Sequence, residues 1–227
     1  IKKIYISPRN KLISKKISKR FKKVTIANNN QQVIDRSNWV FLAVTPQVGS
    51  KILSKLTFNK NKKIISLIST INFEKLKKYT KSKNIFRVIP LPFIGMRKGP
   101  IIICPKDNQL KNFFRHLGKV IELKNEKTSK AFWSTSSFMA SFYFLLDQTS
   151  NWLTSKGIKK KDAEDYTREL FLALSEDAIN KNKSSLKQLV LESQTPGGTN
   201  AYVLNQLKKK KFYKVQQTVL NSIFKKF

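Results

Sequence analysis

With 227 residues, 40% apolar content and only 7 Gly and 7 Pro, the chain can form one large domain or two modest ones and is unlike a disordered or fibrous protein. The net charge of +33 suggests a nucleic-acid partner, but only 7 of the 46 basic residues are Arg, the better reader of bases and phosphates. We therefore predict a salt-sensitive attraction to polyanions and no specific nucleic-acid binding. A single cysteine, Cys104, cannot form an internal disulfide and favours a reducing, cytoplasmic location, while the longest apolar stretch, Ala131–Leu146, is too short and too rich in Ser and Thr for a membrane span of ~20 residues.

The first half of the chain alternates short apolar runs with helical patterns, which predicts a parallel or mixed sheet with helices on its faces. We predict strands at Ile4–Ile6, Val24–Ile26, Val40–Val44, Ile64–Ile68, Phe86–Ile89, Ile101–Cys104 and Val120–Leu123. We predict helices at Lys11–Lys22, around Ile52–Leu56, at Phe73–Tyr79 and at Leu110–Leu117. The unbroken run Val40–Val44 is typical of a strand buried on both faces. Because ligands of open α/β sheets bind beyond the carboxyl ends of strands, the end of this run indicates where a ligand would lie.

The second half is helical and very apolar. We predict helices at Ala131–Ser155, ended by Gly157, and at Asp162–Ala178, Ser185–Ser193 and Asn200–Phe227. The predicted domains are residues 1–125 and 126–227. Consecutive aromatic and aliphatic residues at Phe142–Leu145 exceed what a lone helical bundle needs, so we expect this half to form a dimer.

Several short motifs occur along the chain in a characteristic order. Val40–Gln47 reads Val-Phe-Leu-Ala-Val-Thr-Pro-Gln, and Thr195–Thr199 reads Thr-Pro-Gly-Gly-Thr. With Ile4–Arg9, Arg87–Pro90 and the helix from Ala131, they resemble the pyrroline-5-carboxylate reductase family, NAD(P)H-dependent enzymes that make proline from its cyclic imine. The resemblance covers essentially the whole chain. It implies an α/β plus all-α protein, with an N-terminal Rossmann-like dinucleotide-binding domain followed by a C-terminal helical dimerisation domain.

The start of the chain departs from that family. The family opens with a strand and a glycine-rich turn, G-x-G-x-x-G/A, that holds the pyrophosphate, and nothing here matches it. Ile4–Ile6 corresponds to the second strand of the family, so the first βα unit is absent. We expect a fragment lacking roughly 25–30 residues, with a degenerate protein as the alternative. Loss of a central strand would leave a bare edge beside Ile4–Ile6.

The resemblance also predicts a nucleotide site. An NAD-selective site places Asp or Glu after the second strand to bind the ribose 2′-hydroxyl, whereas this chain has Ser7 and Arg9, which suit a 2′-phosphate. We therefore predict that NADP(H) is preferred over NAD(H). Asn30 aligns with a residue near the adenine. The resemblance implies that the ribose and nicotinamide lie along Ala43, Val44, Thr45, Pro46 and Gln47 and that Pro90 closes the pocket. The family usually has Lys at the place of Thr45. An ordinary solvated turn is the alternative for Ser7 and Arg9, and a plain loop for Asn30.

The Pro-Gly-Gly loop predicts a carboxylate site, because backbone N–H groups at a helix N-terminus bind anions well. The substrate-binding residues implied by the resemblance are Ser137, Thr195, Gly197, Gly198, Thr199 and Asn200. Thr199 and Asn200 are candidate polarisers of the substrate, and no catalytic side chain is certain. A helix–helix turn capped by Thr199 or Asn200 is the alternative explanation.

Other candidates for chemistry are weaker. His116 is the only histidine, and we expect it on an exposed helix without a catalytic role. We expect Cys104 to be a core residue, and no metal cluster is predicted.

We therefore predict an NADPH-dependent reductase of a small cyclic imino acid, converting pyrroline-5-carboxylate to proline, as a homodimer or higher oligomer joined through its C-terminal helices. Ile89–Phe93, Thr135–Met139 and Asn200 differ from the family where it holds the imine ring. A related NADP-dependent oxidoreductase acting on another imine or carbonyl compound therefore stays open, as does a non-catalytic dimeric remnant.

Overall fold

The computed structural model describes residues 1–68 and 70–226, which form two compact units, Ile1–Trp133 and Ser134–Lys226. The units divide inside helix α6 (Glu126–Ser136). The predicted domain boundary after Asn125 stays a prediction.

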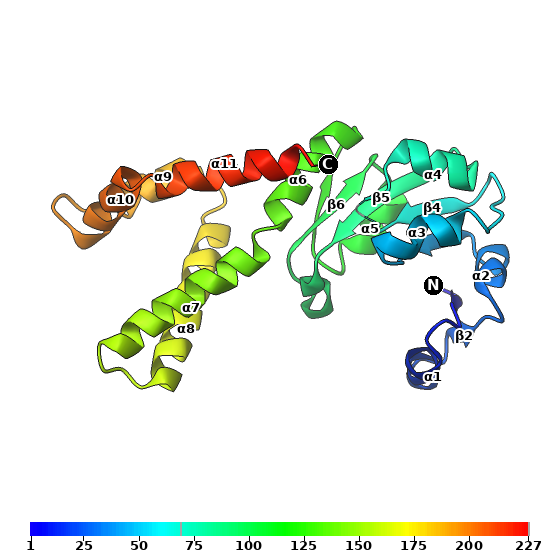
Figure 1. The fold of residues 1–227 in the computed structure, drawn as a ribbon, viewed down its shortest axis with the longest axis horizontal. Helices are drawn as coiled ribbons and strands as arrows, with labels where there is room; N and C mark the ends of the chain where they lie inside the picture. Colours follow the sequence, from blue (N-terminus) through cyan, green and yellow to red (C-terminus); the bar gives the residue numbers. More distant parts are fainter. Residues whose placement is uncertain (69, 227) are drawn as a thin grey trace. The chain divides into compact units, whose positions relative to one another are not determined.

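The first unit contains the alternating strands and helices expected from the sequence (Figure 1). Its strands are β1 (Ile4–Ile6), β2 (Val24–Ile26), β3 (Trp39–Leu42), β4 (Lys63–Ser66), β5 (Ile85–Pro90), β6 (Pro100–Cys104) and β7 (Lys119–Glu122). Its helices are α1 (Lys11–Arg20), α2 (Asn30–Arg36), α3 (Pro46–Leu53), α4 (Phe73–Thr80), the 3-10 helix η1 (Pro92–Met96), α5 (Asn108–Phe114) and the start of α6.

The strands form two separate sheets. β1 pairs with β2 in parallel, and the larger sheet has the order β3-β4-β5-β6-β7. Within the larger sheet only the β5–β6 pairing is antiparallel, so β6 and β7 run opposite to β3, β4 and β5. The structure therefore confirms a Rossmann-like α/β unit with a mixed sheet. Strands β1 and β3 lie at the ends of their sheets in the described residues, and the loss of a strand beside β1 stays a prediction.

Helices cover both faces of the larger sheet, and the alternation of side chains along β4 shows how. Ile64 packs in a cluster with Ile34 of α2 and Leu76 of α4, whereas Ile65 faces the opposite side and packs with Leu110 of α5. Ile64 and Ile65 are both fully buried. Successive strand residues point to opposite faces, so an unbroken apolar run is the sequence signature of such a strand.

A cavity of about 960 Å³ lies between the two sheets. It is lined by β1, by α2 and by the strand β3 with its extension to Val44. Its lining is mostly apolar, including Ile4, Ile6 and Val40. The position of β1 and the opening beside β3 explain one wrong prediction: Val40 and Leu42 are buried as expected, but Phe41 is 39% exposed, so the strand is not buried on both faces.

Helix α2 and the 3-10 helix η1 of the first unit escaped prediction. The run Asn28–Gln32 carries no apolar periodicity, yet α2 begins at Asn30 because the Asn29 side chain accepts a hydrogen bond from the Gln32 N–H, at 2.8 Å. Helix α3 also begins earlier than expected, at Pro46, a residue whose fixed φ suits the first helical turn.

The second unit is all helical. Its elements are the rest of α6, then α7 (Met139–Ser155), α8 (Lys160–Asn180), α9 (Leu186–Glu192), α10 (Thr199–Lys209) and α11 (Phe212–Phe224). Helices α7 and α8 pack side by side, and small buried residues, Ser150, Ala163 and Thr167, allow close approach. Large apolar side chains stay exposed on every helix from α7 to α11, among them Trp152, Leu174, Leu186, Tyr202 and Val215.

Two long helices predicted here are each broken in two. The helix predicted from Ala131 to Ser155 divides at Ser137 and Phe138, whose N–H groups bond three residues back, to Ser134 and Thr135. Hydroxyl side chains compete for backbone groups, and this stretch is rich in them. The helix predicted from Asn200 divides at Lys211, which takes a left-handed φ of 58° within a run of four lysines. Its predicted end, Phe227, lies outside the described residues.

Candidate functional site

Three of the predicted nucleotide residues lie together at the carboxyl end of β1. The Ser7 hydroxyl donates a hydrogen bond to the Asn30 side-chain oxygen at 2.7 Å, and the Arg9 N–H donates to the Ser7 oxygen at 3.3 Å. The turn after β1 is thereby joined to the start of α2, which follows the parallel strand β2. The turn that carries Ser7 and Arg9 thus meets the start of α2 where parallel strands end.

A second cavity, of about 330 Å³, opens beside these residues. It is lined by Arg9, Asn30, Val48, Lys51, Ile52, Lys55 and Leu56. The three cations are exposed, whereas the apolar members are half buried. No acidic side chain lines this cavity or the larger one in the described residues.

The wall of this smaller cavity is held by a pair of hydrogen bonds. The Gln31 side chain donates to the Thr57 carbonyl at 2.8 Å and accepts from the Thr57 N–H at 2.9 Å. Gln31 follows Asn30 on α2, and Thr57 follows Leu56 beyond α3. The two lining elements are therefore fixed relative to each other.

The remaining predicted cofactor residues are divided between the larger cavity and its surroundings. Ala43 and Val44 line the larger cavity together with Ser7, Arg9 and Asn30. Thr45, Gln47 and Pro90 line neither cavity. Thr45 precedes α3 as its N-cap without a side-chain cap bond, Pro46 opens the helix, Gln47 is exposed, and Pro90 ends β5.

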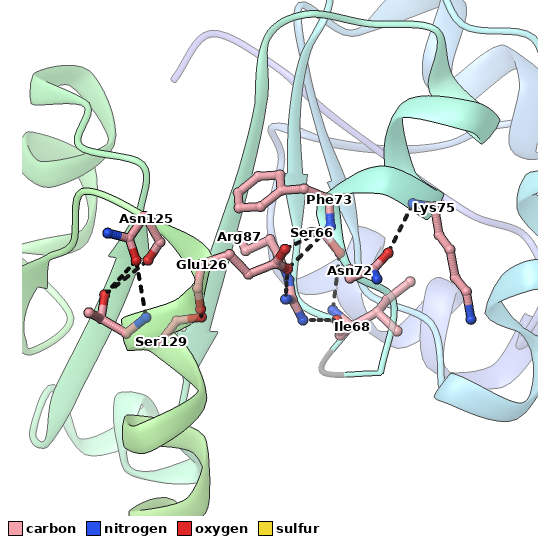
Figure 2. Close-up of polar contacts among 10 residues, drawn as sticks. Ser66, Ile68, Asn72, Phe73, Lys75, Arg87, Asn125, Glu126 and Ser129 are labelled. Carbon is pink, nitrogen blue, oxygen red and sulfur yellow. Dashed lines mark hydrogen bonds and ion pairs between the residues drawn. The ribbon is translucent and has the colours of Figure 1, made fainter. Parts of the chain in front are cut away.

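A buried ion pair, which sequence reasoning missed, joins β5 to the start of α6 (Figure 2). Arg87 of β5, whose side chain is 3% exposed, pairs with Glu126 at the start of α6 and donates to the Ile68 carbonyl at 3.4 Å. The Arg87 guanidinium also lies 3.7 Å from the ring centre of Trp133. The Glu126 carboxylate in turn accepts from the Phe73 N–H at 3.2 Å, which joins α6 to the start of α4.

Burial shapes the chemistry of this cluster. Desolvation lowers the pKa of the Arg87 guanidinium, and the Glu126 charge opposes that shift. Desolvation, reinforced by Glu126, raises the pKa of the nearby Cys104 thiol to about 11. Cys104 is 1% exposed, as expected of a core residue, and at neutral pH it is an unreactive thiol.

The Pro-Gly-Gly loop belongs to the second unit and forms a tight turn. Gly197 takes a left-handed φ of 73°, and the Gly198 N–H donates to the Thr195 carbonyl at 2.9 Å. The Asn200 side-chain amide donates to the Ser193 carbonyl at 3.1 Å. Helix α10 begins at Thr199, with Gly198 rather than Thr199 or Asn200 as its cap. The Gly198 N–H is therefore engaged within the turn.

Ser137, the remaining predicted substrate residue, lies in the break between α6 and α7. The predicted cofactor residues thus all belong to the first unit, and the predicted substrate residues all belong to the second. His116 is exposed in the turn after α5 and lines neither cavity. Across residues 1–68 and 70–226, no cluster of three or more His, Cys, Asp or Glu side chains forms a metal site.

Sequence reasoning also missed two cavity lysines. Lys51 and Lys55 are four residues apart, as are Val48 and Ile52, and both pairs follow Pro46 in the sequence. This helical spacing could have indicated that the four residues lie close together. Glu126 gave no such signal, because its partner is 39 residues away in sequence. In the described part of the chain, no helix is long and apolar enough to cross a membrane.

Family models match two segments of the chain. Residues 126–227 match the model of the pyrroline-5-carboxylate reductase dimerisation domain, and residues 2–72 match that of NADP oxidoreductases, coenzyme F420-dependent. No curated protein sequence matched the chain.

Solved structures share the fold at low sequence identity. The 1-pyrroline-5-carboxylate reductase of Streptococcus pyogenes is similar with a TM-score of 0.82 and 19% identity, over 99% of this chain and 88% of that one. The pyrroline carboxylate reductase of Plasmodium falciparum, solved with NADP bound, has a TM-score of 0.75 and 19% identity, over 90% and 81%. The enzyme of Coxiella burnetii has a TM-score of 0.73 and 22% identity, over 89% and 79%. Residues 126–227 therefore carry a pyrroline-5-carboxylate reductase dimerisation domain, and the chain as a whole shares the fold of the solved pyrroline-5-carboxylate reductases.

Proposed function

We propose that this chain is an NADPH-dependent reductase of a small cyclic imino acid, with pyrroline-5-carboxylate as the first substrate to test. The observation that carries the proposal is the pairing in one chain of an NADP-oxidoreductase half and a pyrroline-5-carboxylate reductase dimerisation half. The convergence of Ser7, Arg9 and Asn30 where β1 ends supports it.

The described residues fit one end of the cofactor. The smaller cavity has a mainly apolar lining, to which Arg9, Lys51, Lys55 and Asn30 also contribute; an apolar wall suits an adenine ring, and basic side chains beside it suit a phosphate. When bound, NADPH supplies the hydride. In this proposal Arg9 neutralises the 2′-phosphate, and Ser7 and Asn30 fix the ribose and adenine side.

The substrate end of the proposal rests on the loop Thr195–Asn200. Its tight turn presents the first N–H groups of α10, beginning with that of Thr199, to a substrate carboxylate. Thr199 and Asn200 remain the proposed polarisers, although the Asn200 amide also braces the turn through Ser193. Reduction of an imine needs little further side-chain chemistry, because positioning supplies much of the rate.

The test is oxidation of NADPH by the purified chain with a panel of cyclic imines, beginning with pyrroline-5-carboxylate. Turnover of that substrate supports the proposal, whereas turnover only of another imine or a carbonyl compound favours the related oxidoreductase. The substitutions at Ile89–Phe93 and Thr135–Met139 give that second reading its weight. Binding of no nicotinamide nucleotide would leave the non-catalytic dimer.

We further propose that the chain assembles as a homodimer through its C-terminal helices, with higher oligomers open, and acts in the cytoplasm. The match to the dimerisation domain covers all of α7 to α11. Large apolar side chains are exposed on these helices, and burial against a second copy of the chain would remove them from water. Light scattering after size-exclusion chromatography should give twice the chain mass. Leu174→Glu, at a side chain 58% exposed on α8, should shift the protein toward monomer, whereas Lys183→Glu at an exposed polar site should not. A wild-type monomer contradicts the proposal.

A further inference from the structure

The smaller cavity carries an inference about how the proposed enzyme selects its nucleotide. The cavity measures about 330 Å³, near the lower end of the roughly 300–1,000 Å³ of small-molecule pockets, so it holds one nucleoside rather than a whole dinucleotide. Half-buried apolar side chains, Val48 and Ile52, form one wall of it. They are four residues apart and share a face of α3.

Three basic residues are among those that line the cavity. Arg9 comes from the turn after β1, Lys51 from α3, and Lys55 from the turn that follows α3. None of these three cations takes part in an ion pair formed within the described residues. Three like charges around one cavity repel one another, and a doubly charged anion would relieve that repulsion.

The cavity also lacks the group that would recognise an unphosphorylated ribose. A free 2′-hydroxyl is bound by an acidic side chain in NAD-selective sites, and the described lining contains none. A phosphate monoester has oxygens enough to accept from Arg9 and from both lysines. Charge-assisted hydrogen bonds of this kind are the strong ones.

The geometry is fixed before any ligand arrives. The paired hydrogen bonds between Gln31 and Thr57 hold α2 against the segment that carries Lys55. The hydrogen bond between Ser7 and Asn30 holds the turn after β1 against the start of α2. Preorganisation of this kind lowers the entropic cost of binding.

We propose that Lys51 and Lys55, together with Arg9, bind the ribose 2′-phosphate and determine the selection of NADP(H) over NAD(H). The inference rests on the proposed function, and it assigns the selectivity to two side chains of the α3 segment rather than to the β1 turn alone.

Calorimetric titration tests it with adenosine 2′,5′-bisphosphate and adenosine 5′-monophosphate, which differ only in the 2′-phosphate. The wild-type chain should prefer the bisphosphate. In the double variant Lys51→Ala/Lys55→Ala, binding of the bisphosphate should weaken at least tenfold, about the loss expected for one or two charge-assisted bonds. Binding of the monophosphate should change less than twofold. The charge-conserving variant Lys51→Arg/Lys55→Arg should keep the preference.

The matched control is Lys77→Ala/Lys78→Ala, which removes the same charge from exposed positions on α4. Circular dichroism confirms that each variant is folded. The inference is overturned if the control loses as much preference as the cavity variant, if the cavity variant keeps its preference, or if the wild-type chain binds neither nucleotide. Imine reduction with NADH and NADPH alike would overturn it while leaving the proposed function intact. A bisphosphate preference lost on cavity substitution, without any reductase activity, would support it and contradict the function.

Discussion

Replacement of Glu126 by Gln tests the energetic weight of the buried pair with Arg87. The substitution keeps the shape of the side chain and removes its charge. Arg87 is 3% exposed and Glu126 is 23% exposed, so the guanidinium cannot turn to water for compensation. Two of its other contacts, the Ile68 carbonyl and the Trp133 ring, carry no formal charge.

The expected loss is about 2–3 kcal/mol of unfolding free energy. Breaking a buried pair costs roughly 3–5 kcal/mol, and the partial exposure of Glu126 places this case at or below the lower end. For a chain of this size such a loss lowers the melting temperature by roughly 5–10 °C. Urea unfolding followed by tryptophan fluorescence and by circular dichroism measures it, since Trp133 stacks on Arg87 itself.

The chain offers a matched control in Glu122→Gln. Glu122 pairs with Lys111 at 2.8 Å, but the Lys111 side chain is 51% exposed, so this loss should stay under about 1 kcal/mol. The double variant Arg87→Met/Glu126→Gln should recover part of the stability, because no buried charge remains. Equal losses for Glu126→Gln and Glu122→Gln would refute the reasoning that burial of the cation decides the cost.

Three further substitutions each test one local feature of the structure. The pKa of the Cys104 thiol rises from the ordinary 9.0 to about 11 on folding, so stability is fully present below pH 9.0 and roughly 2–3 kcal/mol is lost as pH rises toward 11; Cys104→Ala should remove that part of the pH dependence in urea titrations. Gly118→Ala should cost roughly 1–3 kcal/mol, measured by thermal melting, because a Cβ there would collide with the Gly99 carbonyl, a backbone atom with little room to move. Asn29→Ala removes the cap of α2 and should cost about 1 kcal/mol, with weaker nucleotide binding because α2 carries Asn30; unchanged melting would contradict the assigned cap.

The strands of the first unit could be predicted because burial on both faces leaves a direct mark on the sequence. Ile64 and Ile65 face opposite helical layers, and only an unbroken apolar run satisfies both. The exposure of Phe41 could not be read in the same way. The run Val40–Val44 records that the strand is apolar, but its exposure depends on what lies beside β3, which is set by sheet order rather than by the run itself.

The helix breaks show a different limit. Apolar periodicity continues through Ser137 and through Lys211, because periodicity describes which face is apolar and not whether the backbone is continuous. Neither break contains Gly or Pro, the residues that usually signal one. The pairing of Arg87 with Glu126 could not be predicted from the sequence either, because it depends on the packing of α6 against β5.

The net charge of +33 gives the most general lesson about this chain. With 46 basic residues and 13 acidic ones, most lysines must lack a carboxylate partner, so an unpaired lysine is uninformative by itself. Lys51 and Lys55 gain meaning only because they share a preorganised cavity with Arg9 and an apolar wall. Lys77 and Lys78 have the same charge without that setting. If substitution of Lys51 and Lys55 changes the preference between nucleotides more than substitution of Lys77 and Lys78, the difference is due to the position of the lysines, because both double variants remove the same charge.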